Sequence, residues 1–96
     1  MPSDRIVAVL AYAGHCLEML RKARSEDDMH EIAERMATVA KAKLHPSERR
    51  CNLVSALMAA ETIDQEYVAW VLGGAAPLED SKYPYWDLVL RNAGEL

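Results

Sequence analysis

Aromatic side chains gather in the C-terminal third of the sequence, next to a loop that contains Gly and Pro. Five of the six aromatic residues fall within the last thirty positions, as Tyr67, Trp70, Tyr83, Tyr85 and Trp86. Tyr and Trp combine a large apolar area with a polar tip, and they are over-represented among the anchor residues of protein interfaces. The cluster predicts either a satellite core or a surface that anchors a partner.

Charge is distributed unevenly along the chain, whose net charge is −4. Residues 1–51 carry nine Lys and Arg against eight Asp and Glu, a balance of +1, whereas residues 52–96 carry two against seven, a balance of −5. The aromatic end is therefore the acidic end. A surface of this kind repels phosphates and attracts a basic protein partner.

The aromatic residues near the last expected helix cannot all share one face. Tyr85 and Trp86 are neighbours there, and successive helical side chains point about 100° apart. We therefore expect at least one of Tyr83, Tyr85 and Trp86 to face outward, with two acids as a rim. The predicted partner-binding surface consists of Trp86, Tyr85, Tyr83, Trp70, Asp80 and Asp87.

A short basic stretch crosses the expected turn between the second and third helices. Its cations could hold nucleic acid in the manner of a helix-turn-helix motif, with the helix from Ser47 presented to a groove. The turn lacks the expected Gly, and four cations would neutralise only a few phosphates. Nucleic-acid binding is therefore the alternative function, and its candidate residues are Lys41, Lys43, Arg49 and Arg50, with His45 and Arg35 beside them.

Histidine and acidic residues of the second expected helix suggest a metal site, because Asp27, His30 and Glu34 are spaced to share one helical surface. A metal site in a helical bundle needs matching ligands from facing helices. The nearest candidates, His15 with Glu18, would sit at a different height. We expect no metal and no other cofactor.

The two cysteines, Cys16 and Cys51, are isolated thiols without a CxxC spacing. Cys51 has no His or acid at a catalytic spacing, and Cys16 directly follows His15, where adjacent helical side chains point apart. Both are expected to be packed thiols, which is typical of a reducing compartment. No catalytic group emerges, so we expect the protein not to be an enzyme.

The apolar run from Ile6 to Ala13 is the only segment that resembles a targeting signal. It lacks the positive flank of a secretory signal, and it is too short to span a bilayer, which needs about 20 residues. We interpret it as part of a helix and expect a cytoplasmic protein that does not enter a membrane.

Helical periodicity and capping residues predict the elements that position these groups. Apolar residues recur at three- and four-residue steps in a first helix that follows the cap Ser3 and ends near Arg24. Ser25, with Asp28 three residues later, predicts the start of a second helix. That helix should end near His45, because a proline disfavours helical backbone in the residue before it.

The later helices are marked by Pro, Gly and capping patterns. Pro46 fits the first turn of a third helix, which Ser47 could cap. Thr62 and Gln65 predict a fourth helix over residues 63–72, either separate from the third or continuous with it, and Gly73-Gly74 ends it. Pro84 predicts a last helix over residues 85–93, with Gly94 at its end.

These elements predict an all-α fold, a small antiparallel bundle of four or five helices within a single domain over residues 1–96. No segment alternates with period two for long enough to form a strand. At 51% apolar and 27% charged residues, the composition is that of an ordinary globular protein.

Residues 52–72 carry a resemblance to a known family. A Leu- and Ala-rich segment leads into an acidic turn, through Leu53, Ala56, Leu57, Glu61, Thr62, Ile63, Asp64, Glu66 and Val68. This segment resembles the helical tail that closes the peptidase domain of FtsH-type AAA+ zinc proteases. The resemblance implies a helix–turn–helix packing unit. It implies no protease activity, because the HExxH zinc motif of that family does not occur in this sequence.

The sequence as a whole predicts a small non-enzymatic interaction module of a regulator, adaptor or inhibitor type. We expect it to bind a protein partner, or a second copy of itself, through its acidic and aromatic C-terminal surface.

Overall fold

Five α-helices form the described part of the chain, residues 4–73 and 81–96, in the computed structural model. They are α1 (Asp4–Arg21), α2 (Glu26–Lys43), α3 (Pro46–Ala60), α4 (Gln65–Leu72) and α5 (Pro84–Asn92). Residues 4–73 and 81–96 contain no strand. The predicted all-α class and the number of helices are confirmed.

The start of α2 follows from its capping residues. Ser25 is the N-cap, and its hydroxyl accepts a hydrogen bond from the Asp28 amide at 3.2 Å. The Asp28 carboxylate accepts one in return from the Arg24 amide at 3.0 Å. These bonds satisfy backbone donors that the first turn of a helix leaves free, and they explain the sharp turn after α1.

Three helix boundaries differ from those expected. The helix α1 ends at Arg21, before the predicted Arg24. In α3, Pro46 occupies the first turn and His45 is the N-cap, so Ser47 lies inside the helix and does not cap it. The helix α4 begins at Gln65 after the N-cap Asp64, and residues 61–64 separate it from α3.

The end of α5 is closed by a glycine in the left-handed region. Gly94 has a φ of 81° and its amide bonds to the Arg91 carbonyl, while the Glu95 amide bonds to the Leu90 carbonyl at 2.8 Å. This pair of bonds is a Schellman motif. The motif needs a left-handed backbone at position 94, which is unfavourable for residues with a side chain and easy for Gly. The predicted role of Gly94 is confirmed.

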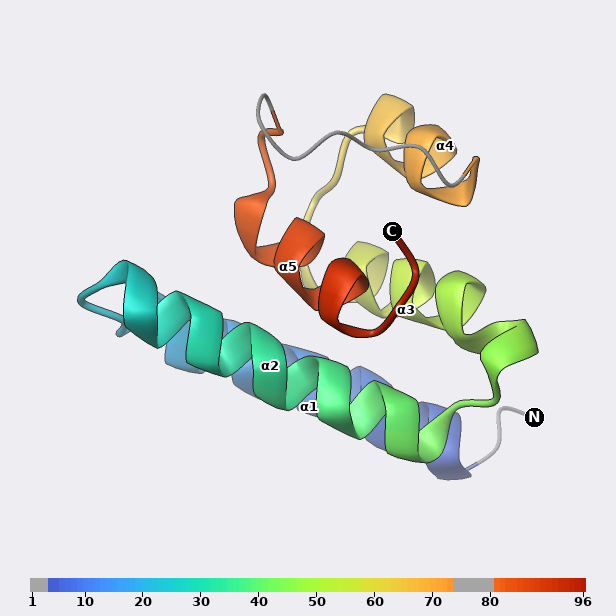
Figure 1. Ribbon diagram of the computed structural model, residues 1–96, viewed down its shortest axis with the longest axis horizontal. Coiled ribbons are helices and arrows are strands. Elements are labelled where there is room, and N and C mark those ends of the chain that lie inside the picture. Colours follow the sequence, from blue (N-terminus) through green and yellow to red (C-terminus); the bar gives the residue numbers. More distant parts are fainter. Residues whose placement is uncertain (1–3, 74–80) are drawn as a thin grey trace.

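Two layers of helices enclose the core. Figure 1 shows α1 and α2 side by side as an antiparallel hairpin, with α5 and α3 over it and α4 farthest from it. The contacts agree, because α5 packs on α2, α3 packs on α1, and α4 packs on α3. The largest fully buried side chains are Trp86, Met36, Leu53, Leu57 and Leu90.

No helix among the described residues is long and apolar enough to cross a membrane.

A salt bridge between Arg5 of α1 and Glu48 of α3 joins two helices across the bundle. The Glu48 carboxylate also accepts a hydrogen bond from the His45 amide at 3.2 Å. The Arg5 guanidinium, followed by this amide, holds the pKa of Glu48 below its usual range, and Glu48 raises the pKa of Arg5. The folded state therefore favours the charged form of Glu48.

This lowered pKa predicts acid-dependent stability. Glu48 stabilises the fold above the ordinary glutamate pKa of about 4.3, and the stabilisation disappears as the pH falls through the lower pKa of the folded state. The melting temperature of Glu48→Gln should therefore lie below that of the native chain at neutral pH, and the two should converge in acid. Arg5→Gln should show the same convergence in thermal unfolding curves. A difference that persists unchanged in acid would contradict this account of the pair.

Candidate functional site

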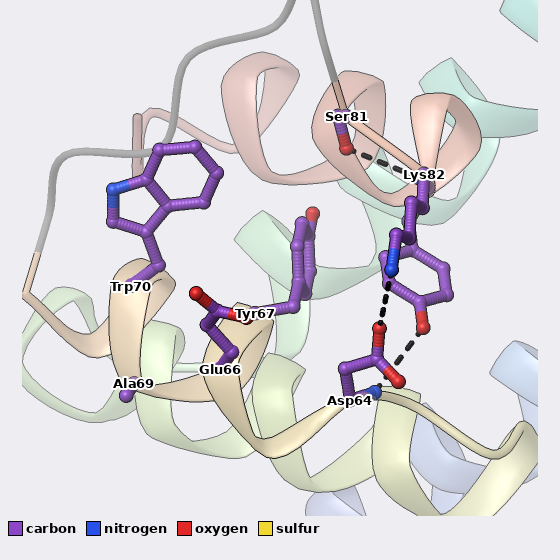
Figure 2. A pocket seen from close by; sticks show the side chains of 8 residues that line it. Asp64, Glu66, Tyr67, Ala69, Trp70, Ser81 and Lys82 are labelled. Atoms are coloured by element: carbon purple, nitrogen blue, oxygen red, sulfur yellow. Dashed lines mark hydrogen bonds and ion pairs between the residues drawn. The ribbon is translucent and has the colours of Figure 1, made fainter.

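Helix α4 presents an aromatic and acidic face on which Glu66 and Trp70 are exposed and Tyr67 is buried. Glu66 and Trp70 are four residues apart and Tyr67 and Trp70 are three apart, so the three share one side of the helix. Trp70 is 39% exposed, whereas Trp side chains are highly buried on average. In Figure 2 the Glu66 carboxylate projects between the Trp70 indole and the Tyr67 ring.

The segment before α5 forms the opposite wall. The Tyr83 hydroxyl accepts a hydrogen bond from the Asp64 amide at 3.1 Å, and Lys82 Nζ lies 3.3 Å from Asp64 Oδ2. The rings of Tyr67 and Tyr83 meet edge to face, with centroids 4.7 Å apart. These contacts hold the two walls together on either side of a cavity.

The cavity has a volume of about 520 Å³ and opens to solvent (Figure 2). This size is within the range of small-ligand and side-chain sites. Among residues 4–73 and 81–96, its lining combines three aromatic side chains, two carboxylates and one ammonium group. The lining residues are Asp64, Glu66, Tyr67, Ala69, Trp70, Ser81, Lys82 and Tyr83. We call this cavity the α4 pocket.

The described lining residues of the α4 pocket carry one uncompensated negative charge. Lys82 is paired with Asp64, whereas the Glu66 side chain forms no ion pair or hydrogen bond with residues 4–73 or 81–96. Glu66 is exposed, so its charge is hydrated and costs little in the free protein. The unpaired carboxylate favours the binding of a cationic group, which would replace the water around Glu66.

A buried hydrogen bond fixes the floor of the α4 pocket. The Tyr67 hydroxyl donates to Asp87 Oδ1 at 2.6 Å, and Asp87 is 1% exposed. Burial, followed by the Asp87 carboxylate, raises the pKa of Tyr67 well above its usual range. The hydroxyl therefore stays protonated and keeps donating to Asp87, so the Tyr67 ring is held in place.

Of the three residues of which at least one was expected to face outward, Tyr85 and Trp86 are both buried, whereas Tyr83 is half-buried. Tyr85 is 4% exposed and Trp86 is 2% exposed, and their rings pack edge to face with centroids 5.0 Å apart. The Trp86 indole nitrogen donates to Glu61 Oε2 at 3.0 Å. Because α2, α3 and Tyr67 of α4 surround α5 on different sides, adjacent residues of this short helix are both buried.

The other predicted interface residues divide into three groups. Asp87 is buried beneath Tyr67, so it cannot serve as part of an exposed rim. Tyr83 is half-buried and Trp70 is exposed, and the structure brings these two together at the α4 pocket. Asp80 lies outside the described residues.

The arginines of the basic stretch have partners within the chain. Arg49 donates to the Ala93 carbonyl at 3.4 Å and to the Leu44 carbonyl at 3.3 Å, which ties the ends of α2 and α5 to α3. Arg50 Nε lies 3.3 Å from Glu95 Oε1. These contacts explain both arginines as structural groups. Lys41 and Lys43 remain exposed in the last turn of α2.

The cysteines differ from each other in burial. Cys16 is fully buried and burial raises the pKa of its thiol, as expected of a packed residue. Cys51 is exposed, so the expectation that it is packed is wrong. It shares an outward stripe of α3 with Ser55 and Met58. In the part of the chain that the structure describes, no group of three His, Cys, Asp or Glu could hold a metal ion.

Comparisons with known proteins found no match: no family model fits the chain, and no curated protein or solved structure is similar to it. The resemblance of residues 52–72 to the FtsH-type tail stays a prediction. In that range the structure has α3, a connection over residues 61–64 and α4.

Proposed function

We propose that this protein is a non-enzymatic interaction module, of a regulator, adaptor or inhibitor type, that binds a basic segment of a protein partner in the α4 pocket. The observation that carries the proposal is the exposed Trp70 beside the unpaired Glu66. An exposed Trp beside a pocket is typical of an interface anchor, and such anchors supply much of the binding energy of an interface.

The charge of the chain supports a basic partner. Residues 52–96, which supply every lining residue listed for the α4 pocket, have a charge balance of −5, which would accelerate the approach of a cationic segment and repel nucleic acid. The Trp70 indole would supply apolar contact, and Glu66 would supply a charge at the centre of that contact. We further propose a cytoplasmic location, which the two free thiols support.

A selection from a phage-displayed library of random peptides on the immobilised full chain would test this function. We expect the enriched peptides to carry net positive charge and to bind Trp70→Ala at least about tenfold more weakly than the native chain. Met58→Ala is the matched control, because it also truncates an exposed large apolar side chain but lies on α3 outside the α4 pocket. It should leave binding unchanged.

Other outcomes would overturn the proposal. Enriched peptides without positive charge, equal binding to Trp70→Ala, or no enrichment would each contradict it. If the native chain self-associates and Trp70→Ala abolishes this self-association, the partner is a second copy of the chain and not a basic segment of another protein. Salt-sensitive binding of duplex DNA that is lost when Lys41 and Lys43 are changed to Ala would favour the nucleic-acid alternative.

A further inference from the structure

Resting on the proposed function, we propose that the α4 pocket receives an arginine side chain of the partner. Its guanidinium stacks on the Trp70 indole and pairs with the Glu66 carboxylate. The inference therefore names the group that the partner inserts, and it follows from the lining of the α4 pocket.

The spacing on α4 places the two recognition groups together. Glu66 and Trp70 are four residues apart, so their side chains leave neighbouring points of the helix surface. Figure 2 shows the Glu66 carboxylate directed toward the space beside the indole. A planar guanidinium can stack on an indole face and still offer two N–H groups to one carboxylate. This combination of contacts matches arginine.

The pair of tyrosine rings that joins the two walls of the α4 pocket adds a preformed aromatic surface. In this edge-to-face pair, the Tyr67 hydroxyl is anchored by Asp87 and the Tyr83 hydroxyl by the Asp64 amide. Two of the three rings are therefore already fixed before a ligand arrives. Less side-chain entropy is lost on binding when the site is preorganised.

The charges of the α4 pocket exclude other occupants. An anion would meet Glu66 and the paired Asp64, and an apolar group would strip water from Glu66 without giving it a partner, which is costly. A lysine ammonium could pair with Glu66, but it is more strongly hydrated than a guanidinium and cannot stack as a plane. Arginine is therefore preferred over lysine.

Three blocked pentapeptides of sequence Gly-Ser-X-Ser-Gly would test the inference, with arginine, lysine or the neutral arginine analogue citrulline at X. Each is titrated into the labelled full chain, and dissociation constants are read from the backbone amide resonances of α4. We expect the arginine peptide to bind about tenfold more tightly than the citrulline peptide, because citrulline keeps the plane that stacks on Trp70 but loses the charge that pairs with Glu66 and strengthens the stacking.

Variants separate the two contacts. Glu66→Gln should weaken the arginine peptide about tenfold and leave the citrulline peptide nearly unchanged. Glu26→Gln, at an exposed acid in the first turn of α2, is the matched control and should have no effect. Trp70→Ala should weaken the arginine and citrulline peptides together, because both planes stack.

The arginine assignment would be overturned by equal dissociation constants for the arginine and citrulline peptides, or by tighter binding of the lysine peptide. It would also be overturned if the amide resonances of α4 show no saturable shift. If those results occur while the library still yields basic peptides that depend on Trp70, the proposed function stands and only the arginine contact fails. If the arginine peptide binds but the library yields nothing, the α4 pocket recognises guanidinium groups and the proposed protein partner fails.

Discussion

Trp86→Ala is expected to lower the free energy of unfolding by about 3 to 5 kcal/mol, the usual cost of removing a buried aromatic side chain. Trp86 is 2% exposed and is the largest fully buried side chain of the described residues. Its removal leaves a cavity between α5 and its neighbours and also deletes the hydrogen bond to Glu61. Chemical denaturation followed by circular dichroism measures this loss.

The expected loss is a large part of the stability of a domain of this size, which is typically about 5 to 15 kcal/mol. If Trp86→Ala does not fold, Trp86→Phe provides a milder version, since it keeps most of the buried area. Trp70→Ala is the control, because it truncates the same kind of side chain at a position that is 39% exposed, so it should cost clearly less stability than Trp86→Ala. Equal stability of Trp86→Ala and the native chain would contradict the assignment of Trp86 to the core.

Tyr67→Phe is expected to destabilise the protein by about 3 kcal/mol, because it leaves a buried carboxylate without its donor. Asp87 is 1% exposed, and its Oδ2 already has no hydrogen-bond partner in the described part of the chain. The Tyr67 hydroxyl, at 2.6 Å from Oδ1, is therefore the bond on which the burial of Asp87 depends. Denaturant unfolding of the purified variant would measure the effect.

Two further variants isolate this bond. Tyr83→Phe removes a hydroxyl that accepts from an exposed amide, so it should cost less than about 1 kcal/mol. The double variant Tyr67→Phe with Asp87→Leu should recover at least about 1 kcal/mol relative to Tyr67→Phe, because no buried carboxylate remains unpaired. If the double variant is less stable than Tyr67→Phe, the burial of an unpaired carboxylate is not the cause of the loss.

Local signals in the sequence were sufficient to predict the helices. Ser25 with Asp28, Pro46, Pro84 and Gly94 each act on the backbone within a few residues, and each lies at a helix end in the structure. Weaker signals were less accurate: the caps expected at Ser47 and Thr62 each lie two residues from the observed N-caps, His45 and Asp64.

The burial of the aromatic cluster could not be predicted from spacing along one helix. The argument that Tyr85 and Trp86 must face different ways is correct for the helix, but it assumes that only one side of α5 is covered. Because neighbours lie on several sides, both residues are buried. A helix enclosed in this way loses the polar face on which amphipathic reasoning depends.

The α4 pocket was only partly predictable. Trp70 and Tyr83 were expected at the interface, and the spacing of Glu66 and Trp70 could have indicated a shared face. The approach of Lys82 and Tyr83 to Asp64 joins positions 18 and 19 residues apart, and no local rule predicts such a contact.

The resonances of the two indole N–H groups test the division between a binding Trp70 and a core Trp86 most directly. They would be followed in a two-dimensional nitrogen–proton spectrum during titration with a basic peptide selected on the chain, with Trp70→Phe used for assignment. We predict that the Trp70 signal shifts and saturates while the Trp86 signal stays in place. A Trp86 signal that moves as far as that of Trp70, or a Trp70 signal that does not move, would contradict the account.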